Sequence, residues 1–107
     1  MTTFDERERS YEAKFAHDED LRFKATARRD KLFGAWAAAQ LGLSGAAAED
    51  YAKEVVRADF KSAGDTDVIA KVLGDLKLKG VGIDEPALKR KLVELMAEAV
   101  AAIEAGR

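Results

Sequence analysis

The sequence predicts an all-α domain, a bundle of four helices with short connections, preceded by a short N-terminal arm that is helical or disordered. Apolar residues make up 48% of the 107 positions but aromatic residues only 7%, so much of the apolar content is Ala, which suits closely packed helices. Apolar residues recur at steps of three and four in successive segments, as on the buried faces of helices. Residues 75–79 alternate like a strand, but no partner strand is predicted, so we assign them to the end of a helix.

Composition excludes several classes of protein. Charged residues make up 36% of the chain and the net charge is −2, so no overall positive field attracts nucleic acid or an anionic membrane. The chain has no Cys, which excludes disulfides and thiolate metal sites. Apolar runs stay well short of the roughly 18 residues that a membrane span needs, and the N-terminus is charged from Asp5 onward. We therefore expect a cytoplasmic protein.

The longest predicted helix lies between Asp18 and Gly42 and organises the other helices. This stretch has no Pro and is rich in Ala, Leu, Lys and Arg, with Asp18 as the N-cap and Gly42 as the stop. Its predicted buried stripe is Leu21, Ala25, Arg28, Leu32, Ala35 and Ala39, with Trp36 beside it. A second, flanking row is Phe23, Ala27, Gly34, Ala38 and Leu41. We expect the remaining helices to pack on this one.

Three further helices follow in the predicted bundle. The first begins after Ser44, has an apolar face that includes Phe60, and ends near residues 62–64; the second begins at residues 65–67. The third begins after Asp84, with Pro86 in its first turn, and ends at Gly106. The predicted core is Leu21, Leu32, Trp36, Val55, Val72, Leu88, Leu92, Leu95 and Ile103.

The N-terminal arm is predicted to be separate from this bundle. A capping box at residues 3–6 starts a helix over residues 4–16, on which Phe4, Tyr11 and Phe15 project within about 40° of one another. This aromatic stripe is about 100° out of phase with the stripe that starts at Leu21. The stripe is then either free for a partner or turned onto the core by a bend near residues 17–18. We divide the chain into an arm, 1–17, and a bundle, 18–107.

Residues that carry chemistry are sparse. The only His, at position 17, is followed by three acidic residues. Such a cluster is typical of the start of a helix, so no metal site is predicted. Residues 80–82, Gly-Val-Gly, lack the third Gly and the βαβ context of a dinucleotide loop and are predicted to be a turn. No Ser has a nearby base that would activate it. We expect no catalytic residues and no enzymatic activity.

A basic cluster on the long helix is the one candidate for binding a phosphate. Its members are Lys24, Arg28, Arg29 and Lys31. Asp20 and Asp30 interrupt the cluster, and a solvated face with salt bridges is the favoured interpretation.

Several motifs resemble the zeta inhibitor subunit of bacterial F-type ATP synthases. These are Lys14-Phe15-Ala16, Arg28-Arg29 followed by Lys31-Leu32, and Gly34. The resemblance is dense over residues 4–42, and beyond them it rests on length, an Ala-rich second helix, the Gly-Val-Gly turn and the helix start at residues 84–86. Asp30 and Phe33 depart from the family pattern, in which Asn and Leu are expected.

The resemblance implies an inhibitory arm on a four-helix domain. In this family the arm inserts as a helix into the catalytic head, between alpha and beta subunits and next to the gamma subunit of the rotating stalk. It blocks rotation in the hydrolytic direction and allows ATP synthesis, at the cytoplasmic face of the inner membrane of alphaproteobacteria. An aromatic helix face suits binding in a groove. The expected contact residues are Phe4, Arg7, Arg9, Tyr11, Lys14 and Phe15.

Two other functions stay open. The chain is either a small regulatory domain that binds a nucleotide at Arg28, Arg29 or Lys31, or a module that dimerises through its aromatic stripe. Weak ATP or ADP binding is associated with the family, and no resident cofactor is expected. For the inhibitor we expect a monomer in the free state.

Overall fold

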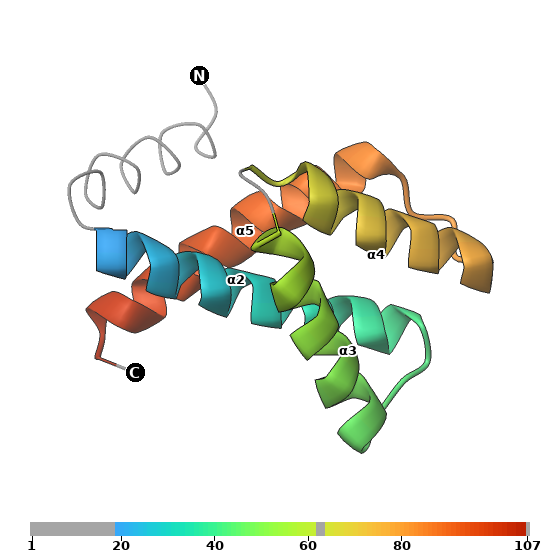
Figure 1. The fold of residues 1–107 in the computed structure, drawn as a ribbon, viewed down its shortest axis with the longest axis horizontal. Coiled ribbons are helices and arrows are strands. Elements are labelled where there is room, and N and C mark those ends of the chain that lie inside the picture. Colours follow the sequence, from blue (N-terminus) through green and yellow to red (C-terminus); the bar gives the residue numbers. More distant parts are fainter. Residues whose placement is uncertain (1–18, 62–63, 107) are drawn as a thin grey trace.

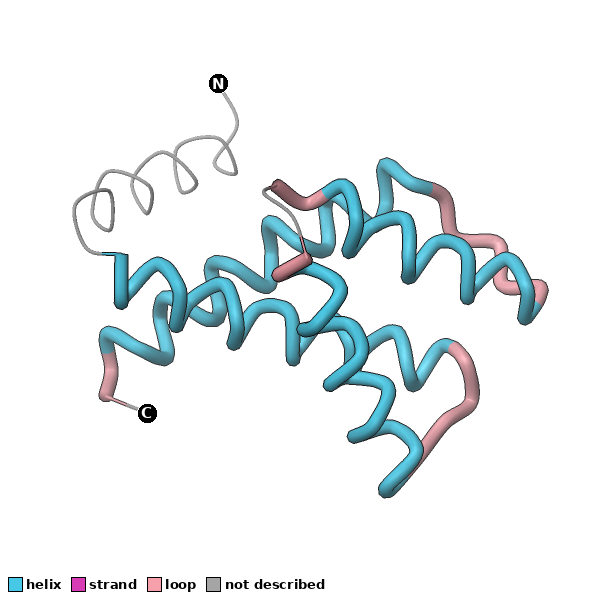
Figure 2. Tube along the Cα trace, viewed as in Figure 1, coloured by secondary structure: helices cyan, strands magenta, loops and turns pink. Residues whose placement is uncertain are grey.

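The computed structural model describes residues 19–61 and 64–106, and within them it forms four helices and no strand. The helices are α2 (Glu19–Gln40), α3 (Gly45–Asp59), α4 (Thr66–Lys79) and α5 (Glu85–Glu104). This confirms the predicted all-α fold with short connections, and Figure 2 shows the loops as brief links between long helices. The helix predicted over residues 4–16 lies outside the described residues.

Helix α2 is the central element of the bundle. It contacts the other three helices, most extensively α3 and α5, and α4 packs against both α3 and α5. In Figure 1, α2 and α5 lie side by side, so that the start of α2 and the end of α5 are at the same end of the molecule. The start of α2 is where the N-terminal segment is attached.

Two helix ends follow the predicted local chemistry closely. The Asp84 carboxylate accepts a hydrogen bond of 3.1 Å from the backbone N–H of Ala87, which makes Asp84 the N-cap of α5, with Pro86 in the first turn. Helix α4 ends at Gly80, whose φ of 81° is the left-handed conformation that favours Gly. The alternating residues 75–79 are the last turns of α4, as predicted.

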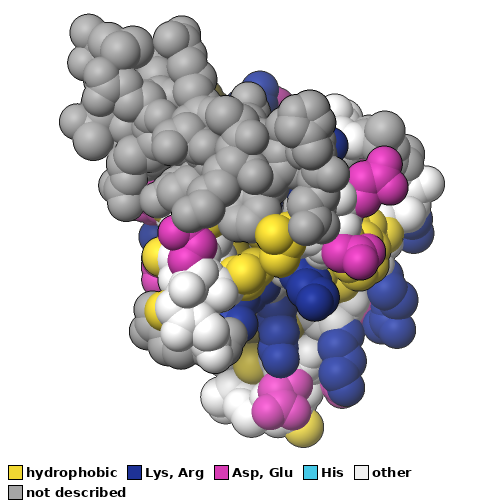
Figure 3. All heavy atoms as spheres, turned by 90° about the vertical axis from the view of Figure 1, so that its left-hand side faces the viewer, with side chains coloured by type: hydrophobic (Ala, Val, Ile, Leu, Met, Phe, Trp, Pro, Cys, Tyr) yellow, Lys and Arg dark blue, Asp and Glu magenta, His cyan; other side chains and the backbone are white. Residues whose placement is uncertain are grey.

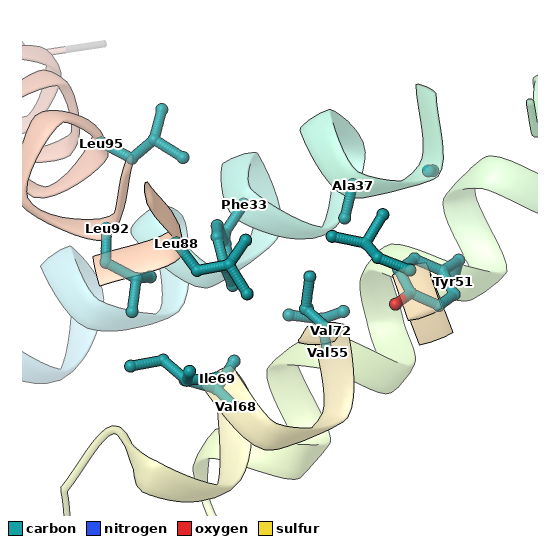
Figure 4. Packing of buried hydrophobic residues seen from close by; sticks show 12 residues of the cluster. Phe33, Ala37, Tyr51, Val55, Val68, Ile69, Val72, Leu88, Leu92 and Leu95 are labelled. Carbon is teal, nitrogen blue, oxygen red and sulfur yellow. The ribbon is translucent and has the colours of Figure 1, made fainter. Parts of the chain in front are cut away.

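The core lies where α3, α4 and α5 meet the second half of α2, and Figure 4 shows its side chains pointing toward one another. The predicted core residues that are buried in it are Val55, Val72, Leu88, Leu92 and Leu95. Leu32 and Trp36 are partly buried against this cluster. Leu21 and Ile103 pack instead on a smaller cluster around Ala25 and Val100, toward the start of α2.

The buried face of α2 differs from the predicted stripe. Arg28, Ala35 and Ala39 were predicted to be buried and are exposed. The buried positions are Ala25, Arg29, Asp30, Phe33, Gly34, Ala37 and Ala38. The helix carries Ala on several sides, so its stripe was ambiguous. Phe33, which is fully buried, and Gly34, which contacts α3, determine how the helix is turned.

Gly34 allows α2 and α3 to pack unusually closely. A Cβ atom at this position would stand 2.6 Å from the backbone Cα of Ala52 and 3.2 Å from Cβ of Val55. Since real Cβ atoms do not approach a backbone atom so closely, any side chain here must push the two helices apart.

We expect Gly34→Ala to lower the free energy of unfolding by about 1–3 kcal/mol, the usual cost of overpacking a core. Gly74→Ala on α4 is the matched control, because nothing lies within 4 Å of its Cβ position. That control should stabilise the protein by up to about 1 kcal/mol, since Ala is the better helix former. Urea unfolding measures both, and an unchanged midpoint for Gly34→Ala would show that the helices are not in close contact.

Candidate functional site

The predicted contact residues of the arm cannot be placed in the structure. Phe4, Arg7, Arg9, Tyr11, Lys14 and Phe15 all lie outside the described residues. What the structure gives is the surface to which the arm is joined, at the start of α2, and the surroundings of the basic cluster.

An exposed pair of aromatic rings lies near the start of α2. The rings of Phe23 and Phe60 are stacked, with centroids 4.8 Å apart and an interplanar angle of 26°. Phe23 is 58% exposed and Phe60 is 43% exposed. Phe60 had been placed on the apolar face of its helix and Phe23 in the flanking row of α2. For Phe60 the structure corrects this, because α3 ends at Asp59 and not near residues 62–64. The two rings cover each other rather than entering the core.

The three residues predicted to bind a nucleotide do not form one surface. Arg28 and Lys31 are exposed, whereas Arg29 is only 5% exposed and its guanidinium is held by carboxylates. Nη2 of Arg29 lies 2.8 Å from Oδ1 of Asp30, 3.2 Å from Oδ2 of Asp59 and 2.9 Å from Oδ1 of Asp65. Nucleotide binding by Arg28 and Lys31 stays a prediction.

Sequence reasoning missed the structural role of Arg29. Its bonds join α2 to Asp59, at the last position of α3, and to Asp65, the N-cap of α4. For Arg29 the favoured interpretation, a solvated face with salt bridges, was right about the pairing and wrong about the solvent. The other three members of the cluster, Lys24, Arg28 and Lys31, are exposed, as that interpretation predicts. The available signal was weak: each of the two carboxylates stands at the end of a helix, where the chain turns.

Burial makes this cluster unusual electrostatically. Asp30 is fully buried, and its loss of solvent raises the pKa of its carboxyl group to about 8. The neighbouring Asp59 carboxyl group adds to the rise, and the charge of Arg29 opposes it only in part. Oδ2 of Asp30 and Oδ1 of Asp59 are buried and have no hydrogen-bond partner among the described residues. A proton held between the two carboxyl groups would satisfy both oxygens.

A second polar group ties α3 to α4 beside a shallow groove. The hydroxyl of Tyr51 donates to Oδ2 of Asp75 at 2.8 Å, and Nζ of Lys71 lies 3.0 Å from the same oxygen. Burial and the bond to Asp75 raise the pKa of the Tyr51 phenol, so it stays protonated. Each of these groups has a structural partner, and no nucleophile with an activating base lies among them.

Neither a metal site nor a membrane span is found in the part of the chain that the structure describes. Residues 19–61 and 64–106 contain no group of three or more acidic or His side chains placed to hold an ion. None of the four described helices is both long enough and apolar enough to cross a bilayer.

Comparison with known proteins decides the family. The model of the family described as ATPase inhibitor subunit zeta matches residues 1–102. This chain belongs to the ATPase inhibitor subunit zeta family. The match confirms the resemblance seen in the sequence, and it includes the segment predicted to be the inhibitory arm.

A solved structure supports the fold of this chain. A protein described as "Solution NMR structure of the protein" is 48% identical, with a TM-score of 0.71, and the alignment covers 81% of this chain and 99% of that one. No curated protein matches. Membership in the zeta family indicates a regulatory protein of ATP synthase.

Proposed function

We propose that this zeta-family protein inhibits ATP hydrolysis by inserting its N-terminal arm, residues 1–17, as a helix into the catalytic head of F-type ATP synthase. The arm lies between alpha and beta subunits, against the gamma subunit, and stops rotation in the hydrolytic direction while synthesis continues. The protein acts at the cytoplasmic face of the inner membrane, as a peripheral subunit. The observation that carries the proposal is the family match over residues 1–102, which includes the whole arm.

The fold supports a division of labour between arm and bundle. Helices α2 to α5 bury their own core, which begins at Ala25, and the polar groups of Arg29 and Tyr51 pair within the bundle. The sequence of the arm has an aromatic row at helical spacing, suited to anchoring in a groove. The anchors are Phe4, Tyr11 and Phe15, and the charges that orient them are Arg7, Arg9 and Lys14.

Deleting residues 1–16 should abolish inhibition and leave the bundle folded. The deletion removes all three aromatic anchors but none of the residues in the described core. We expect the melting midpoint to move by only a few degrees, a change of under about 1 kcal/mol for a domain of this size. The measurements are ATP hydrolysis by the cognate catalytic head and thermal unfolding followed by circular dichroism.

Two controls interpret this deletion. A peptide of residues 1–20 should inhibit only weakly, since an isolated helix so short is marginal in water. Full inhibition by the truncated protein would show that the bundle itself is the inhibitory surface, and unfolding of the truncated protein would show that the arm belongs to the core.

A further inference from the structure

A pair of stacked, exposed rings lies at the surface near the start of α2. Three large hydrophobic side chains are exposed within residues 19–61 and 64–106: Phe23, Phe60 and Leu78. Leu78, near the end of α4, lines a groove together with Leu41 and Leu43. Phe23 and Phe60 instead stack on each other across α2 and the end of α3. Two Phe rings left half in water form a ready contact for another protein surface.

The position of the pair matters because of what precedes it in the chain. Helix α2 begins at Glu19, and Phe23 comes four residues later, about 6 Å along the helix axis. The arm ends at residue 17, so the pair lies close to the point where the arm joins the bundle. With the arm in its groove, the chain holds the aromatic pair beside the entrance of that groove.

Basic residues flank both rings. Arg22 and Lys24 are the neighbours of Phe23 in the chain, and Lys61 follows Phe60; all three are exposed. Acidic residues, Glu19 and Asp20, stand one turn earlier on α2. Figure 3, which views the end of the molecule that is on the left in Figure 1, shows hydrophobic atoms at the surface next to a group of Lys and Arg side chains. Such a surface fits an apolar recess with acidic residues on its rim.

We propose that the Phe23–Phe60 pair is a second docking surface, which binds the outside of the catalytic head at the entrance of the groove that receives the arm. The inference rests on the proposed function, because only insertion of the arm brings the pair to that place. Once the arm is bound, the second contact is intramolecular and benefits from a high effective concentration. A small aromatic contact is then enough to slow the release of the arm.

The test is the full-length double variant Phe23→Ser/Phe60→Ser, which keeps the arm intact. We expect its half-inhibitory concentration toward the cognate catalytic head to rise about tenfold, mainly through faster dissociation, as for the loss of an interface hot spot. Leu78→Ser is the matched control, because it removes an exposed apolar side chain of α4 that is 89% exposed. It should inhibit like the parent. The single variant Phe23→Ala should also raise the half-inhibitory concentration. It replaces the double variant in the test if the melting temperature of the double variant is more than a few degrees below that of the parent.

Each other outcome has a definite meaning. Unchanged inhibition by the double variant overturns the proposal. Stronger inhibition also overturns it, and assigns the pair to holding the arm in the free protein. The proposal is also overturned if the parent sediments as a dimer and the double variant as a monomer, because the pair would then be a contact between two copies of the chain.

The arm deletion separates this inference from the proposed function. If the deletion abolishes inhibition while Phe23→Ser/Phe60→Ser has no effect, the arm mechanism stands and the docking surface fails. If the deletion protein still inhibits fully, the arm mechanism fails, and with it the reason for placing the pair at the groove.

Discussion

Leu92→Ala is expected to lower the free energy of unfolding by about 2–5 kcal/mol, the range for truncating a buried Leu. Leu92 on α5 is 4% exposed and packs in the core cluster that includes Phe33 and Leu88. The truncation leaves a cavity between helices that the rest of the chain holds in place. A domain of this size has a total stability of roughly 5–15 kcal/mol, so this single change removes a large share of it.

The control for Leu92→Ala is Lys53→Ala on α3. Lys53 is exposed, and its truncation should cost less than about 0.5 kcal/mol. Urea unfolding of the parent and both variants, analysed with a common dependence of the free energy on urea concentration, gives the two differences in unfolding free energy. Equal losses would mean that the assignment of buried and exposed helix faces is wrong.

Helix α5 could be read from the sequence because its side chains divide sharply. Large apolar residues recur on one side, and charged residues fill the other, so only one face can be buried. Leu88, Leu92 and Leu95 are accordingly buried, as predicted. Its start was equally clear, since Asp84 and Pro86 are each favoured there for a separate physical reason.

Helix α2 could be located but not oriented. Its bounds follow from composition and caps, but Ala stands on several sides and gives no preference for one face. In the structure, the fully buried Phe33 fixes which side of α2 faces the core. Gly34, the next residue, has no side chain and so lets α3 pack close to α2. Without knowledge of which helix approaches Gly34, the pattern alone predicted a neighbouring stripe.

The buried charges were hidden from any local pattern. Arg29 stands in a run of charged residues that is typical of a solvated face, and its distant partners, Asp59 and Asp65, are 30 and 36 positions away. The same limit applies to Phe23 and Phe60, whose stacking depends on how α2 meets the end of α3. The family, in contrast, was predictable, because its motifs lie in consecutive residues and the family match confirmed it.

The buried cluster makes the stability of the protein depend on pH through Asp30. In the folded protein the pKa of Asp30 is raised to about 8 by burial and by the Asp59 carboxyl group. In the unfolded chain the same carboxyl group has a pKa of about 3.9. Between these two values the folded state holds a proton that the unfolded state has lost, so the stability from this group falls as pH rises.

The Asp30→Asn variant should remove this dependence. The neutral amide keeps an oxygen for Arg29 and places N–H donors near Asp59, whose Oδ1 has no other partner among the described residues. The unfolding free energy of the variant, relative to the parent, should therefore increase by up to about 1.4 kcal/mol per pH unit from pH 5 to 8 and then level off. Denaturant unfolding at each pH measures the difference.

Asp50→Asn, an exposed change of the same charge on α3, provides the comparison. It should stay parallel to the parent across the range, because the Asp50 side chain is exposed to solvent in the folded protein. A parallel curve for Asp30→Asn as well would mean that the Asp30 carboxyl group is ionised in the folded protein at pH 5. The single guanidinium of Arg29 would then balance three carboxylates, two of them buried. The difference in unfolding free energy between Asp30→Asn and Asp50→Asn is measured as a function of pH. A steep rise of this difference would mean that a shared proton, and not Arg29 alone, stabilises the junction of α2, α3 and α4.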